Sequence, residues 1–233
     1  MKIILVLLMG VINFISAQTK DPDKILDEVK KKFASVKDYT VDVNIKIDVN
    51  FLKVPESRAK IYYKAPDKIH VESESFAMLP REGLNSSPAA FLNGEYTALY
   101  EREDTVDNKK VSIVKIIPLN SESDIVLSTL WIDQDKDVIM KIESNTKVAG
   151  TFQIEFDYDE KSNYPLPSKM EFTLNTGDFS LPLPRGMTGD TKKKTEERSA
   201  GKEQKGKVYI TYSNYKVNRG IPDSVFEEEG KQE

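Results

Sequence analysis

The sequence predicts a mainly β, antiparallel domain that is led by one helix. Apolar residues recur at spacings of three and four between residues 25 and 36, which is typical of an amphipathic helix. After residue 38 the spacing changes to two, and about ten segments keep this alternation. Turn sequences such as Asn93-Gly94 and Asp107-Asn108 separate the segments at short intervals. Sequential hairpins of this kind favour a meander or a closed or partly closed barrel.

The first 17 residues have the pattern of a secretory signal peptide. Lys2 provides the positive start, an apolar stretch follows, and small residues end at Ala17, where we expect cleavage. The alternative is a membrane anchor, but the stretch contains Asn13 and is shorter than the roughly 20 apolar residues of a spanning helix. Cleavage removes Lys2, so the net charge of −4 becomes −4 − 1 = −5 in the mature chain, residues 18–233.

The predicted helix begins after Asp21, whose carboxylate can cap the free amide groups of the first turn. Pro22 suits the first helical position, and lysines fall mainly on one face and late in the helix, where cations are favoured. The opposite face is apolar and consists of Ile25, Leu26, Val29, Phe33 and Val36.

A long alternating strand follows over residues 39–51, with apolar residues on one face and polar residues on the other. A turn at residues 65–67, which contains Pro66, separates the next two strands. The remaining alternation predicts strands at residues 59–63, 69–71, 96–101, 111–119, 125–132, 138–144, 151–158, 169–174 and 208–215. The sheet is therefore expected to have one apolar and one wet face.

Two segments break the alternation. Residues 76–92 are apolar but follow neither period for long, and their Pro and Gly residues limit them to loops and short helical turns. Residues 188–206 are rich in Lys and Glu and lack a buried face, so we expect a flexible charged loop there. Both segments are expected to be insertions in a single domain that spans residues 18–233.

Composition excludes several kinds of chemistry. The chain has no Cys, so disulfides, thiolate nucleophiles, Cys-ligated metals and a lipid-modified cysteine are absent. The net charge of −4 argues against a nucleic-acid-binding protein. His70, the only histidine, lies on the polar face of its strand near Glu72, as a solvated side chain would. No catalytic motif is present, so we predict neither an enzyme nor a cofactor.

An acidic string at Asp133, Asp135 and Asp137 invites comparison with a calcium-binding loop. Such a loop needs a Gly at its sixth position and a Glu at its twelfth, where this chain has Val138 and Ser144. We therefore interpret the string as a hairpin turn and predict no metal site.

The apolar face of a sheet of about ten strands is larger than one short helix can cover. Its concave side must be filled by side chains, by a lid or by a ligand. Residues 76–92 supply lid-like apolar surface, and a fixed core plug and a movable lid are equally compatible with their composition. The lid residues would be Phe76, Met78, Leu79 and Phe91.

Several segments, in their order along the chain, resemble a known family. They are the helix at 23–39, Ala-Lys-Ile-Tyr-Tyr-Lys-Ala-Pro-Asp-Lys-Ile-His-Val at 59–71, Leu-Trp-Ile-Asp at 130–133, Val-Ile-Met-Lys-Ile at 138–142, Tyr-Ser-Asn-Tyr-Lys at 212–216 and Gly-Ile-Pro-Asp-Ser-Val-Phe at 220–226. This order is similar to that of the outer-membrane lipoprotein carrier superfamily, which comprises LolA/LolB-like proteins with RseB-like sensors as relatives.

The resemblance implies an incompletely closed barrel that wraps on the N-terminal helix, with short helices or loops as a lid. It also implies that acyl chains bind in an apolar cavity, for which the candidate lining residues are Val43, Ile45, Ile47, Ile61, Tyr63, Phe152, Ile154 and Phe156. In carriers of this kind a strand arginine holds the lid shut, and Arg58 is the nearest positional match.

The function expected from this resemblance is that of a monomeric periplasmic carrier, not anchored by lipid, for lipoprotein acyl chains or another lipid. An inner-membrane release complex and an outer-membrane acceptor would be its partners. The alternative is an RseB-like envelope sensor or interaction module without bulk transport.

Overall fold

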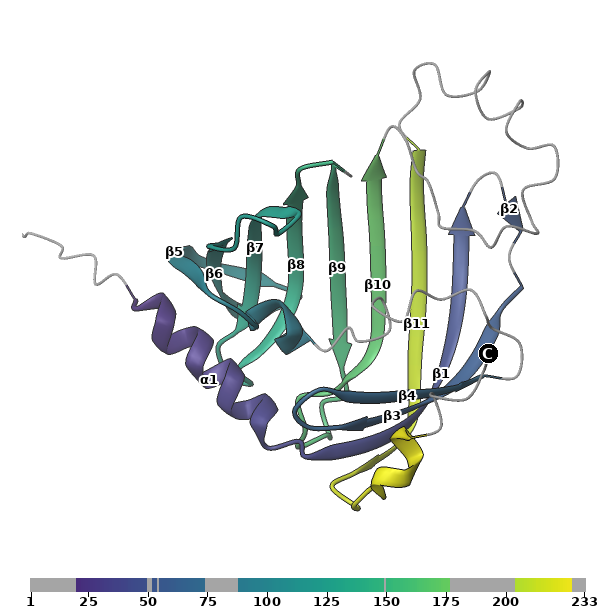
Figure 1. The fold of residues 1–233 in the computed structure, drawn as a ribbon. Helices are drawn as coiled ribbons and strands as arrows, with labels where there is room; N and C mark the ends of the chain where they lie inside the picture. Colours follow the sequence, from purple (N-terminus) through teal and green to yellow (C-terminus); the bar gives the residue numbers. More distant parts are fainter. Residues whose placement is uncertain are drawn as a thin grey trace, which may run out of the picture.

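The computed structural model describes residues 20–49, 52–53, 55–73, 88–148, 150–176 and 204–227. One α-helix, two short 3-10 helices (η) and eleven strands lie in these ranges (Figure 1). In chain order they are α1 (Pro22–Ala34), β1 (Asp38–Val49), β2 (Leu52–Lys53), β3 (Ser57–Lys64), β4 (Lys68–Ser73), η1 (Pro88–Leu92), β5 (Tyr96–Val106), β6 (Lys109–Pro118), β7 (Ile125–Asp133), β8 (Val138–Thr146), β9 (Thr151–Tyr158), β10 (Pro167–Thr176), β11 (Gln204–Val217) and η2 (Asp223–Phe226).

The strands form one antiparallel sheet in the order β4-β3-β1-β11-β10-β9-β8-β7-β6-β5, with β2 paired to β1. The two ends of this order, β4 and β5, do not pair with each other in the described part of the chain, so the curved sheet stays open (Figure 1). Strands β5 to β11 follow one another as neighbours, and β1 then pairs with β11. The predicted open, mainly antiparallel β fold with one leading helix is confirmed.

Helix α1 packs on the β5–β8 end of the sheet, where it contacts η1, β5 and β8 (Figure 1). As predicted, its first turn is capped by Asp21, whose carboxylate accepts a hydrogen bond of 3.1 Å from the Asp23 amide. Leu26 and Val29 are fully buried at the contact between the helix and the sheet. In the described ranges no helix combines the length and hydropathy needed to cross a membrane.

Two of the predicted turns close hairpins as expected, whereas Asn93-Gly94 joins η1 to β5. Asp107 and Asn108 both have positive φ, 49° and 60°, and they join β5 to β6 in a two-residue turn. The acidic string is the turn between β7 and β8, because the Asp133 carboxylate accepts hydrogen bonds from the amides of Asp135 and Lys136 at 2.8 and 3.1 Å. Its interpretation as a hairpin turn is confirmed.

Most predicted strand boundaries differ from the structure by one or two residues, and two boundaries differ by more. Strand β5 continues to Val106, beyond the predicted end at residue 101. The sequence does not predict this extension, because residues 101–105 are exposed on both faces at the sheet edge and show no alternation. Strand β11 begins at Gln204, inside the expected charged loop, because residues 204–206 pair with β10. Residues 188–203 of that loop and residues 1–17 of the expected signal peptide lie outside the described residues.

Candidate functional site

A continuous apolar stripe crosses one face of the sheet. It consists of eight residues, each directly opposite the next across a strand pair, and antiparallel partners point to the same face. From β5 to β1 these residues are Tyr100, Val114, Leu130, Ile142, Ile154, Phe172, Val208 and Ile47. This stripe is the central feature of the candidate site.

The two halves of the stripe are buried to different degrees. Leu130 and Ile142 are fully buried in the half that lies near α1. Phe172, Val208 and Ile47 are only partly buried and pack against the edge of the core. The main contacts of α1 among the described elements are with η1, β5 and β8, so the stripe continues over β10, β11 and β1 beyond the strands on which the helix mainly packs.

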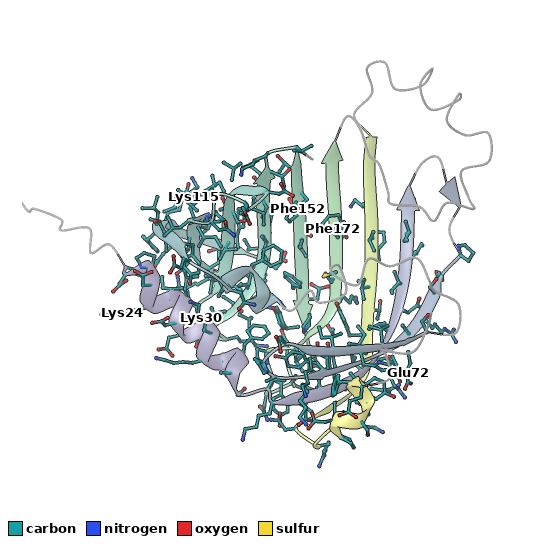
Figure 2. The ribbon with its side chains drawn as sticks, viewed as in Figure 1. Lys24, Lys30, Glu72, Lys115, Phe152 and Phe172 are labelled. Atoms are coloured by element: carbon teal, nitrogen blue, oxygen red, sulfur yellow. The ribbon has the colours of Figure 1, made fainter. Side chains whose placement is uncertain are left out.

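Three phenylalanines lie together on the less buried half. The ring of Phe152 in β9 stacks on Phe172 in β10, with 5.6 Å between ring centroids. The ring of Phe91 in η1 lies 6.4 Å from that of Phe152. Figure 2 shows Phe152 and Phe172 on neighbouring strands. Phe91, expected as a lid residue, therefore touches this face, whereas Phe76, Met78 and Leu79 lie outside the described residues.

All eight predicted lining residues come from this same face of the sheet. Ile47 and Phe152 keep exposed surface at the edge of the core, and Tyr63 stacks on Tyr39 at 5.0 Å. The other five are packed core residues with at most 4% of their surface exposed, namely Val43, Ile45, Ile61, Ile154 and Phe156. Their role as the wall of a ligand cavity stays a prediction.

Arg58 lies on the opposite face. It is directly across from Asn44 in β1, and its strand neighbour Ala59 is across from Val43 on the apolar face. Its guanidinium is thus separated by the sheet from Phe91 and the apolar stripe. The expected contact with the lid concerns residues outside the described ranges and stays a prediction.

A cluster of tyrosines on the apolar face was missed by the sequence reasoning. Tyr39 packs edge-on against Tyr215 at 5.7 Å, and Tyr215 stacks on Tyr212 at 6.2 Å. A β-bulge at Asn214, whose φ is +57°, breaks the alternation and brings Tyr212 and Tyr215 to the same face. No sequence pattern indicates the cluster, because its members are far apart in the chain and the bulge reverses the period.

The tyrosine hydroxyls are bound mainly to backbone oxygens. Tyr158 donates to the Ile139 carbonyl at 2.8 Å and Tyr215 donates to the Pro167 carbonyl at 2.9 Å. Burial raises the pKa of both phenols above the ordinary value. The cluster is therefore neutral at physiological pH and closes one end of the apolar face without adding charge.

The described residues contain no group of three or more His, Asp or Glu side chains placed to hold a metal ion. His70 lies on the outer, polar face as predicted, with its ring 5.7 Å from that of Tyr62. The inner face instead offers apolar and aromatic surface, which can shield hydrocarbon from water.

Solved structures of other proteins have a fold similar to that of this chain. No model of a known family and no curated protein matches the sequence. A DUF1329 family protein from Desulfovibrio piger has a solved structure that matches with a TM-score of 0.60 and 16% identity over 90% of this chain and 98% of that chain. A LolA superfamily protein from Nitrosomonas europaea matches with a TM-score of 0.57 and 13% identity over 89% of this chain and 97% of that chain.

The fold of this chain is similar to that of the LolA superfamily protein. A domain from Vibrio parahaemolyticus, assigned to outer-membrane lipoprotein sorting, also matches with a TM-score of 0.55 and 13% identity, over 89% of this chain and 97% of that chain. At these identities the likeness concerns the fold alone. The resemblance inferred from the sequence motifs is confirmed at that level.

Proposed function

We propose that the protein is an exported carrier that holds the acyl chains of a lipid or lipoprotein against the apolar face of its sheet. One observation carries the proposal: the apolar stripe extends beyond α1 to Phe172, Val208 and Ile47, which keep exposed surface. An apolar surface inside a curved sheet is suited to hydrocarbon, because burial of each CH₂ group contributes about 0.8 kcal/mol.

The affinity available from such a face is sufficient for transport. Ten buried methylene groups give a gross gain of about 8 kcal/mol. Association costs roughly 4–15 kcal/mol of lost rotational and translational freedom. Two or three acyl chains of this length would therefore bind with useful affinity, whereas a single short chain would bind weakly.

The remaining parts of the proposal rest on the sequence and on the fold. The pattern of residues 1–17 supports export, and the absence of Cys leaves no site for a lipid anchor, so the carrier would diffuse between membranes as a monomer. Solved structures with this fold include a LolA superfamily protein and the lipoprotein-sorting domain. A membrane complex that releases cargo and an acceptor that receives it would be its partners, and no catalysis is required.

Native mass spectrometry of the protein purified from its own envelope tests the proposal. We expect bound lipid or lipoprotein, and we expect binding of a synthetic triacylated lipopeptide to the apo protein. Phe172→Asp places a carboxylate on the apolar face and should weaken lipopeptide binding at least tenfold. Thr173→Asp, on the outer face of the same strand, should leave it unchanged.

Two results would contradict the carrier proposal. One is the recovery of apo protein only, with no binding of the lipopeptide. The other is equal affinity of the Phe172→Asp and Thr173→Asp variants, both checked to be folded by circular dichroism. Co-purification of a stoichiometric regulatory protein without lipoprotein would favour the sensor alternative instead.

A further inference from the structure

The outer face of the sheet holds a cavity of about 1170 Å³ that the carrier proposal does not use. It lies over β1, β3 and β4, and Figure 2 shows Glu72 at this side of the molecule, away from Phe152 and Phe172. Its volume is somewhat above that of typical small-molecule sites, which measure about 300–1,000 Å³. Among the described residues, its polar lining includes Asn44, Glu56, Arg58, Lys60, His70 and Glu72.

The two cations of this cavity differ in their surroundings. Lys60 lies between two carboxylates, because it is directly opposite Asp42 on one side and Glu72 on the other. Its ammonium is 3.7 Å from the Asp42 carboxylate. Arg58 has the neutral Asn44 as its partner across β1. Within the described ranges no ion pair or hydrogen bond reaches the exposed Arg58 guanidinium, whose planar fork suits a phosphate or carboxylate.

Two hydrogen-bonding atoms of residues that line the cavity, Asn44 opposite Arg58 and His70 opposite Tyr62, also lack partners in the described part of the chain. Asn44 Oδ1 and His70 Nδ1 are buried and make no hydrogen bond within the described ranges. A buried polar atom without a partner costs about 1–3 kcal/mol. Asn44 Oδ1 accepts hydrogen bonds, and so does His70 Nδ1 when the imidazole is neutral with its proton on Nε2. A side-chain rotation that turns either atom towards a ligand hydroxyl would remove this cost.

The carboxylates of Glu72 and Glu56 at the cavity add further acceptors. Glu72 accepts one hydrogen bond of 2.9 Å from the Tyr62 hydroxyl, and Glu56 accepts one of 3.5 Å from the Asn44 amide. Each carboxylate has about four acceptor positions, so most of them are open to a ligand. The cavity therefore offers one cation for an anionic group and an excess of acceptors for neutral donors.

We propose that this outer cavity binds a sugar that carries a phosphate or carboxylate group. The anionic group would bind the Arg58 guanidinium, and the sugar hydroxyls would donate to Asn44 Oδ1, His70 Nδ1 and the carboxylates of Glu56 and Glu72. A ligand with several anionic groups fits less well, because the carboxylates of the cavity outnumber its two cations. A free phosphosugar and a lipid with a phosphosugar headgroup share this chemistry.

Calorimetric titration with glucose 6-phosphate, glucose and inorganic phosphate tests the assignment, because the last two probes are the separate halves of the first. We expect glucose 6-phosphate to bind at least tenfold more tightly than either half. Arg58→Gln should weaken its binding at least tenfold, and Asn44→Ala should weaken it without changing the binding of phosphate. Arg102→Gln is the matched control, since Arg102 lies on the distant edge strand β5 and is paired with Glu101 and Asp104.

Vesicles that contain phosphatidylinositol separate the two sources of the ligand. Binding of these vesicles that depends on Arg58 indicates a lipid headgroup, and binding of glucose 6-phosphate alone indicates a free sugar. The proposal is overturned if neither probe binds, or if the Arg58→Gln and Arg102→Gln variants bind equally well. These results are independent of the carrier proposal, because Phe172→Asp should leave glucose 6-phosphate binding unchanged.

Discussion

The contrast between Leu130 and Phe172 gives a quantitative test of the two halves of the apolar stripe. Leu130 is fully buried near α1, and removal of such a side chain typically costs 2–5 kcal/mol, so we expect Leu130→Ala to lose about 3–4 kcal/mol of unfolding free energy. Phe172 is only partly buried, so its replacement by Ala removes about half of the 1.5–3 kcal/mol that full burial contributes, together with the stacking on Phe152. We expect a loss of about 2 kcal/mol for Phe172→Ala.

Binding should show the opposite order. Phe172→Ala removes a ring from the proposed acyl-chain surface and should weaken binding of a fluorescently labelled triacylated lipopeptide about tenfold, or about 1.4 kcal/mol. Leu130→Ala should leave this affinity within twofold of the wild type. Urea unfolding followed by the fluorescence of Trp131, the single tryptophan, measures stability on the same samples. If Phe172→Ala destabilises the protein as much as Leu130→Ala does and binds the lipopeptide with normal affinity, both halves of the stripe are ordinary hydrophobic core and the reasoning is refuted.

Three further outcomes follow from particular contacts. The hydroxyls of Ser128 and Ser144 lie 2.6 Å apart and are fully buried, so Ser144→Ala should cost about 1–3 kcal/mol in urea unfolding, whereas the double alanine variant should be closer to wild type. Burial, followed by the charge of Glu28, raises the pKa of the Asp137 carboxyl, so its ionised form destabilises the folded state. Asp137→Asn should therefore raise the free energy of unfolding by about a few tenths of a kcal/mol at pH 7, because solvent screens most of the effect, and should leave it unchanged below about pH 3. Hydrogen bonds from Lys68 and Lys64 lower the pKa of the Asp223 carboxyl. The stability that these bonds provide should be fully present above about pH 4 and should be lost as the pH falls through the lowered pKa. Amide chemical shifts of η2 should follow this loss in the wild type but not in Asp223→Asn.

Most elements of the fold could be predicted because their local signals agree with their environment. The alternation that begins at Tyr39 appears because one face of β1 is buried and the other is wet. The part of β5 from Glu101 to Thr105 could not be predicted, since at the sheet edge neither face is buried and the period-two signal vanishes. Residues in such a strand are selected by pairing with β6 alone, which a local pattern does not reveal.

The candidate sites were less predictable than the fold, because they depend on register between distant strands. Alternation could assign Ile47 and Ile154 to the apolar face, but it could not show that Val208 and Phe172 join them in one stripe. Arg58 was selected by position along the chain as a partner of the lid. Only the pairing of Arg58 with Asn44 shows that it lies on the outer face, beside the Asn44 Oδ1 acceptor, which has no donor among the described residues.

The pairing of β1 with β11 creates both candidate sites. On the inner side it places Ile47 opposite Val208 and completes the apolar stripe beyond α1. On the outer side it places Asp42 opposite Ser213 and completes the floor of the polar cavity. Because these are the first and last long strands of the chain, their pairing closes a long loop. Any partly folded state that lacks this pair would therefore have neither site.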